Sequence, residues 1–142
     1  MRFMMLMIPQ GYENAAPGAM PEKEAVAAMM KYNDSLQKAG VLLTLDGLHP
    51  LSAGARVSFP DGKPLVTDGP FVETREVVGG YWMIEVGSKE EAVAWASRCP
   101  AAANETIEVR RVMDFAEFPA DLREAAAGLA QMQKSGKPTA RE

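Results

Sequence analysis

The sequence is poor in the residues that build disulfides, metal sites and many catalytic centres. It contains one cysteine, Cys99, and one histidine, His49, among 142 residues. A single cysteine cannot form an internal disulfide, which favours a reducing, cytoplasmic compartment. The sequence also has no Cys and His set at zinc spacing, no phosphate-binding glycine loop and no nucleophile elbow. We therefore expect neither a metal nor another cofactor.

Basic charge and long apolar runs are scarce as well. The chain carries 15 Lys and Arg residues against 19 Asp and Glu, a net charge of −4. Nucleic acids and anionic membranes bind concentrated basic charge, so we expect neither as a partner. No apolar stretch approaches the ~20 residues that cross a bilayer. The apolar start at residues 1–8 lacks the longer apolar region and cleavage site of a leader, and we interpret it as a strand.

What is present fits one globular domain, because 47% of the residues are hydrophobic and 24% are charged. Ser88 and Glu91 form a capping box that predicts the start of a helix. Apolar periodicity and turn residues predict the following order: strand 3–8, helix 21–39, strand 41–46, a hairpin at 56–59 and 64–67, strand 81–86, helix 88–99 and strand 106–112. This is a ferredoxin-like α+β order with an inserted hairpin, in which both helices cover one face of an antiparallel sheet.

The first predicted strand is apolar on both of its sides. Residues 3, 5 and 7 are Phe, Met and Met, and residues 4, 6 and 8 are Met, Leu and Ile. Two helices cover only one side of such a sheet, so the second apolar side requires another layer. A second copy of the same sheet is the simplest source of that layer, which predicts a homodimer.

Residues 114–142 follow the last predicted strand and form a separate appendage to a domain at 1–113. A single amphipathic helix is predicted from Asp121, with Glu124 at capping-box spacing. Its apolar stripe could pack on its own domain or on a partner subunit. The polar end of the chain is expected to fray.

The segment from Val66 to Glu76, which contains Asp68-Gly69-Pro70-Phe71, resembles the signature of the DGPF group of YCII-related proteins. Gly79-Gly80-Tyr81-Trp82, the Ala39-Gly40-Val41-Leu42 junction and the Arg98-Cys99-Pro100 helix end occur in the order of that group. The resemblance covers roughly residues 1–113. It implies a ferredoxin-like domain that pairs as a dimeric α/β barrel, and it suggests an association with extracytoplasmic-function sigma factors.

No activity follows from this resemblance. Some YCII-related proteins carry a histidine in the first helix, paired with an aspartate, which is interpreted as an active site. The predicted helix at residues 21–39 contains no histidine, so this pair is not carried over.

Asp68 and His49 are the candidate catalytic residues. Asp68 either forms an Asx turn that hydrogen-bonds forward to backbone amides or acts as a catalytic carboxylate. His49 either is a loop residue without a role or acts as a general base, because an imidazole titrates near neutral pH. Glu73 and Arg75 follow the Asp68 turn, where they form ligand contacts or a solvated charge network.

Strand alternation identifies four further candidates. If Trp82, Ile84 and Val86 face the helices, Tyr81 and Glu85 face the other side of the sheet. On the last strand the same alternation places Glu108 and Arg110 on that other side. Buried charges need partners, so these residues form either an ion network at the dimer interface or the lining of a ligand site.

Two functions remain open on these observations. The first is a homodimer that binds a small molecule in a cleft at the subunit interface, with cofactor-independent proton-transfer catalysis by Asp68 or His49 as a further option. The alternative is a regulatory or accessory module of a sigma factor without catalysis.

Overall fold

The structure is a computed structural model that describes residues 1–71 and 76–135. The chain forms two compact units, Met1–Arg111 and Val112–Glu142. Glu73 and Arg75 lie outside the described residues.

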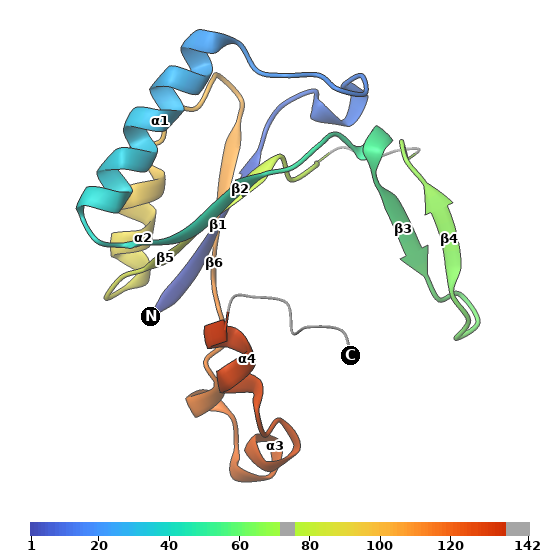
Figure 1. Cartoon of the computed structure of the whole chain (residues 1–142), viewed down its shortest axis with the longest axis vertical. Coiled ribbons are helices and arrows are strands. Elements are labelled where there is room, and N and C mark those ends of the chain that lie inside the picture. Colours follow the sequence, from blue (N-terminus) through green and yellow to red (C-terminus); the bar gives the residue numbers. More distant parts are fainter. Residues whose placement is uncertain (72–75, 136–142) are drawn as a thin grey trace. The chain divides into compact units, whose positions relative to one another are not determined.

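The first unit is built on a four-stranded antiparallel sheet. Its strands are β1 (Arg2–Ile8), β2 (Leu42–Gly47), β5 (Gly80–Glu85) and β6 (Thr106–Arg111), in the spatial order β2-β5-β1-β6. Helices α1 (Lys23–Lys38) and α2 (Lys89–Ala96) lie on the same side of this sheet (Figure 1). The predicted ferredoxin-like α+β fold is therefore confirmed.

Local signals place the helix ends. The backbone N–H of Glu91 donates to Ser88 Oγ at 3.1 Å, which is one half of the predicted capping box, while Glu91 Oε2 accepts from the Gly87 N–H at 2.9 Å rather than from the Ser88 N–H. Helix α1 has no side-chain cap at Glu22, and it ends before Gly40, whose φ of 73° suits glycine.

The core lies between the sheet and the two helices. Its nine buried residues come from β1, from β5 and the residue directly after it, and from the two helices: Phe3, Met5, Met7, Tyr32, Leu36, Trp82, Ile84, Val86 and Ala92. Tyr32 and Trp82 meet edge to face with ring centroids 5.6 Å apart. The indole Nε1 of Trp82 donates to Asn33 Oδ1 at 2.8 Å, so the polar edge of this ring is satisfied.

The side of the sheet turned away from both helices is called the far face below. Its central residues are half-buried in the chain alone: Met4, Leu6 and Ile8 of β1, and Tyr81 and Met83 of β5. Strand β1 was predicted to be buried on both sides. Of the residues of this strand, only Phe3, Met5 and Met7 are buried within the unit. The reason is that the helices pack on one side alone.

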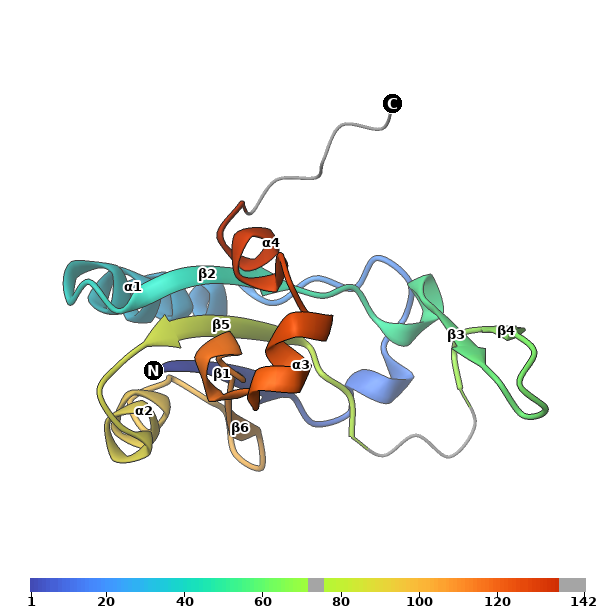
Figure 2. The ribbon, with the colours of Figure 1, turned by 90° about the horizontal axis from the view of Figure 1, so that it is seen from below.

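Strands β3 (Ala55–Ser58) and β4 (Leu65–Asp68) form a separate two-stranded sheet. Every residue of both strands is exposed. The hairpin lies beyond the ends of the four-stranded sheet (Figure 1), and Figure 2 shows the same separation from a second direction. The predicted hairpin is thus present as a sheet of its own rather than as an edge of the main sheet.

The second unit contains a 3-10 turn at Phe115–Glu117 and two short helices, α3 (Ala120–Ala125) and α4 (Leu129–Ser135). The prediction of one amphipathic helix capped by Asp121 is wrong. Pro119 occupies the N-cap position, so Asp121 falls within the first turn, and Gly128, with a φ of 92°, separates the two helices. The capping box is instead made by Asp114 and Glu117.

Candidate functional site

A pocket of about 570 Å³ opens where β1 and β2 end and β5 begins. Two walls enclose it, one from the strand ends and one from the loop between β1 and α1. Its lining consists of Met7, Pro9, Tyr12, Ala15, Ala19, Met20, Pro21, Gly47, Leu48, His49 and Gly79. Most of these side chains are apolar, and this set is called the sheet-end pocket below.

Gly79 forms one side of this pocket with its backbone. Its N–H donates to the Met7 carbonyl at 2.8 Å, and its own carbonyl accepts from the Leu48 N–H at 2.9 Å. A Cβ on Gly79 would lie 2.8 Å from Cγ of Pro9, and one on Gly80 would lie 2.9 Å from the Asp46 carbonyl oxygen. The two glycines therefore permit close approach of the strand ends and the loop.

The loop wall is fixed to the strand wall through Tyr12. This residue lies in a 3-10 turn at Tyr12–Asn14, which follows Gly11 with its φ of 78°. The Tyr12 hydroxyl donates to the Leu48 carbonyl at 2.5 Å, which joins the two walls. Beside it, Oε2 of Glu13 is buried and has no hydrogen-bond partner within the described residues.

His49 is the only imidazole of the chain, and it lines the sheet-end pocket. It follows β2 directly after Leu48, and the residue is exposed. An imidazole at the edge of an apolar pocket can serve as a general base or as a hydrogen-bond donor. Asp68 is not part of the lining, so the pocket does not bring the two predicted catalytic residues together.

Tyr81 and Asp46 form a polar pair on the far face. They are direct partners across β5 and β2, and the Tyr81 hydroxyl donates to Asp46 Oδ2 at 3.0 Å. This hydrogen bond, together with the negative charge of Asp46, raises the pKa of Tyr81 above its ordinary value. Tyr81 is therefore held in its protonated, hydrogen-bond-donating form.

The far face also carries the other residues predicted from strand alternation. Glu108 pairs in register with Leu6, and Arg110 pairs with Met4, so both charges flank the apolar centre of the face. Glu85 is exposed at the end of β5, opposite Arg2. The predicted set thus shares one side of the sheet, with Glu108 and Arg110 on the β6 edge and Glu85 at the end of β5.

The DGPF segment is held by glycine packing rather than by an Asx turn. The Asp68 carboxylate is exposed and makes no hydrogen bond to any described residue. An Asx turn would require a backbone N–H two residues after Asp68, and the residue at that position, Pro70, has none. Instead, the Gly69 N–H donates to the Gly54 carbonyl at 2.9 Å, and a Cβ on Gly69 would overlap the Leu51 carbonyl oxygen. Phe71 receives the Arg56 guanidinium 4.0 Å above its ring.

Cys99 is held as a neutral thiol. It packs against the core cluster, and burial, with a smaller effect of the nearby Glu105 carboxylate, raises the pKa of Cys99 to about 11. A thiolate is the reactive form of cysteine. The side chain therefore fills space at the end of α2 and does not serve as a nucleophile at neutral pH.

Comparison with known proteins gives the family. Residues 1–116 match the YCII-related domain, which is more than half of the chain. The chain belongs to the YCII-related family. An uncharacterised protein of Rhizobium meliloti (strain 1021) is 37% identical to this YCII-related chain over 59 residues, and the match covers 42% of the chain and 48% of that relative.

Across residues 1–71 and 76–135 no three His, Cys, Asp or Glu side chains gather as a potential metal site. Within that same part of this YCII-related chain, no helix has the length and apolar character needed to span a membrane.

The sequence did not identify most of the sheet-end pocket. Its loop wall at residues 9–21 lies between the predicted strand 3–8 and the predicted helix 21–39, and no residue of this loop was a candidate, although Tyr12 is an aromatic residue within a Pro- and Gly-rich segment. Asp46 was not among the candidate residues either. Its pairing with Tyr81 depends on the register between β2 and β5, which includes an irregularity between Leu42 and Thr44.

Proposed function

We propose that this YCII-related protein is a homodimer that binds a small, mainly apolar molecule in the sheet-end pocket, with one polar group of that molecule directed toward His49. The observation that supports this most directly is the pocket itself. Its volume of about 570 Å³ falls within the ~300–1,000 Å³ typical of small-molecule sites. Such sites combine apolar walls with a few placed polar groups, as this one does.

Cofactor-independent proton transfer is the chemistry that fits this lining. His49 is the one imidazole in the lining and can serve as a general base, whereas the Tyr12 hydroxyl is engaged with the Leu48 carbonyl. We assign the catalytic role, if turnover occurs, to His49 and not to Asp68. Asp68 ends β4 and lies outside the lining.

The homodimer is proposed from the far face. Its apolar centre at Met4, Leu6 and Met83 is only half-buried, whereas the side under the helices is fully buried. An antiparallel sheet with one solvated face usually shows polar residues there. A second subunit that covers this centre would remove the apolar surface from water and would place Tyr81, Glu108 and Arg110 near the interface.

Binding can be tested with 8-anilinonaphthalene-1-sulfonate, a fluorescent probe with apolar rings and one anionic group. We expect saturable fluorescence enhancement by the wild type and at least tenfold weaker binding by Leu48→Asp, which places a charge in the lining. Leu43→Asp is the matched control, because Leu43 lies on β2, which ends just before Leu48 in the chain, is similarly exposed and does not line the pocket. Equal binding by all three proteins would remove the pocket as the site.

The role of His49 has its own measurement. The imidazole can donate a hydrogen bond to the sulfonate of the probe, so His49→Ala should bind the probe more weakly than the wild type. Equal binding by both proteins would remove His49 from the site. The association with a sigma factor stays a prediction from the resemblance, and ligand binding without turnover would favour it over the enzyme.

A further inference from the structure

The hairpin β3–β4 presents an apolar side to solvent. Val57 and Val66 are direct partners across its two strands, and Phe59 follows on the same side. Their exposed fractions are 54%, 64% and 63%. Ala55 and Pro64 lie on the same side, and Asp68, the partner of Ala55, adds one carboxylate at the base of the hairpin. The hairpin is called the arm below, and this mainly apolar side is called the apolar side of the arm.

The other side of the hairpin is more polar. Arg56 pairs with Thr67, and Ser58 pairs with Leu65, so three of the four side chains on this side are polar. One apolar and one polar side is the pattern of an antiparallel sheet that packs on another layer. A two-stranded hairpin is at best marginally stable in water unless it packs on something.

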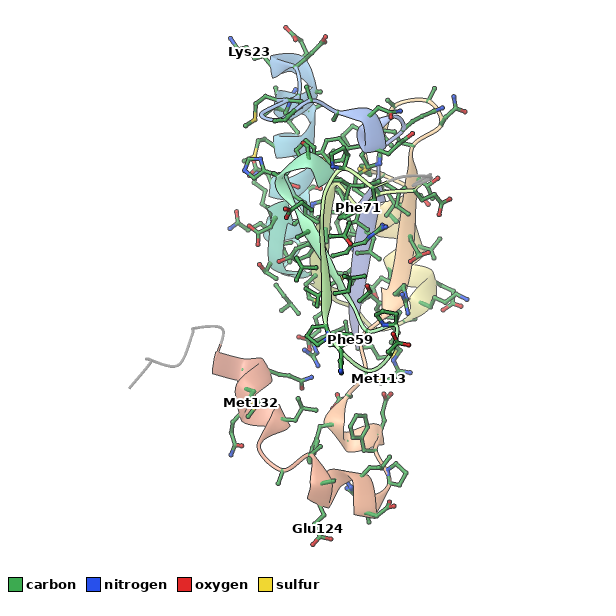
Figure 3. The ribbon with its side chains drawn as sticks, turned by 90° about the vertical axis from the view of Figure 1, so that its right-hand side faces the viewer. Lys23, Phe59, Phe71, Met113, Glu124 and Met132 are labelled. Carbon is green, nitrogen blue, oxygen red and sulfur yellow. The ribbon has the colours of Figure 1, made fainter. Side chains whose placement is uncertain are left out.

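The base of the hairpin is braced, which limits where the hairpin can pack. Gly54 and Gly69 are joined by a backbone hydrogen bond, Gly69 is packed against the Leu51 carbonyl, and Arg56 lies over the Phe71 ring. Figure 3 shows Phe71 at this braced end and Phe59 at the opposite end of the hairpin. The DGPF segment thus holds the hairpin out as an arm.

We propose that the arm of one subunit packs, apolar side inward, on the β1–β6 half of the far face of a second copy of this chain. This inference rests on the homodimer proposed above and specifies what covers the far face. Met4 and Leu6 supply the apolar surface that receives Val57, Phe59 and Val66. The exchange is reciprocal, so the two-fold dimer contains two identical arm contacts.

Charge complementarity supports a second copy as the partner. The arm carries two basic and two acidic side chains, Arg56 and Lys63 with Asp61 and Asp68, and is neutral within a chain of net charge −4. The receiving half of the far face carries Glu108 and Arg110 beside the apolar residues. The arm carries charges of both signs as well, so each charge on the receiving surface can meet an opposite charge on the arm.

The molecular mass in solution tests the arm. We expect the wild type to sediment as a dimer of the 15.3 kDa chain and Val66→Asp to dissociate at least tenfold more readily. Thr67→Asp is the matched control, since it adds the same charge at the next residue of the same strand but on the polar side, and it should remain dimeric. A Val66→Asp protein that dimerises like the wild type would overturn the arm contact.

Cross-linking tests the receiving surface. In a Cys99→Ala background, a chain carrying both Val66→Cys and Leu6→Cys should oxidise to a covalent dimer. Val66→Cys alone should stay unlinked. A covalent dimer formed by Val66→Cys alone would show that two arms pack on each other, which would overturn the proposed surface.

The failures are distinguishable from one another. A monomeric wild type would overturn both the homodimer and the arm. A dimeric wild type that tolerates Val66→Asp would overturn the arm alone and leave the homodimer standing. Probe binding in the sheet-end pocket is read from fluorescence and does not depend on either result.

Discussion

The hydroxyl of Tyr32 donates a 2.8 Å hydrogen bond to the backbone carbonyl of Trp95, which joins helix α1 to helix α2 under the sheet. The same ring meets Trp82 of β5 edge to face. Tyr32 thus links three elements of the core, and burial raises its pKa strongly. The residue therefore stays protonated and keeps its hydrogen bond at neutral and moderately alkaline pH.

Tyr32→Phe removes this hydrogen bond and keeps the ring. The Trp95 carbonyl still accepts from the Arg98 N–H, so we expect a loss of about 1 kcal/mol in the free energy of unfolding and no large penalty for an unpaired acceptor. Tyr12→Phe removes a hydroxyl contact of the same kind at an exposed site and should cost less. Urea unfolding of both variants checks the order, and a larger loss for Tyr12→Phe would contradict it.

Gly69→Ala tests the brace at the base of the hairpin. The added methyl group would overlap the Leu51 carbonyl oxygen, and such overpacking typically costs about 1–3 kcal/mol. Gly47→Ala is the control, because nothing lies within 4 Å of its Cβ position. We expect faster amide exchange in the hairpin of Gly69→Ala than in that of Gly47→Ala. Equal exchange in both variants would show that the brace does not order the hairpin.

Asp46→Asn tests the polar pair on the far face. The hydrogen bond to the Asp46 carboxylate and its charge raise the pKa of Tyr81, so the neutral amide should lower that pKa toward the ordinary value. Phenolate absorbance measured against pH, with Tyr81→Phe used to identify the Tyr81 signal, gives the shift. Asp34→Asn, an exposed carboxylate on α1, should leave the titration unchanged.

Cys99 makes stability depend on alkaline pH. Its pKa rises from 9.0 to about 11 on folding, so below pH 9 both states hold the proton and the contribution is fully present. Above pH 9 the unfolded chain releases its proton first, so the free energy of unfolding falls as the pH rises toward 11. Cys99→Ala should show a shallower fall between pH 9 and 11 than the wild type. Parallel pH profiles would contradict the shift.

The fold was predictable because its signals are local and agree with one another. The Ser88–Glu91 capping box, the glycine stop at Gly40 and the alternation of β1 and β5 each fix an element independently. The predicted hairpin also formed around its Pro60-Asp61-Gly62-Lys63 turn. In the second unit the local signals disagreed. The spacing of Asp121 and Glu124 predicted a helix capped by Asp121, whereas Pro119 takes the N-cap position and Gly128 interrupts the helix.

The candidate site was predictable only in part. Alternation placed Tyr81, Glu108 and Arg110 on one side of the sheet, and the register confirms that placement. His49 was selected for its chemistry, whereas the pocket beside it depends on how the loop at residues 9–21 folds over the strand ends. That folding follows from long-range contacts such as Tyr12 with Leu48, which no local pattern in the sequence encodes.

Gly79 has a consequence for how this scaffold can change its specificity. Its N–H and carbonyl hold Met7 and Leu48, and Pro9 leaves no room for a Cβ, so one boundary of the cavity is bare main chain that cannot acquire a new functional group. Retuning of ligand preference should come from side-chain replacements on the loop that follows β1 or at Leu48 and His49 after β2. Directed evolution of this chain should therefore accumulate its productive changes in those two places and leave the glycine intact.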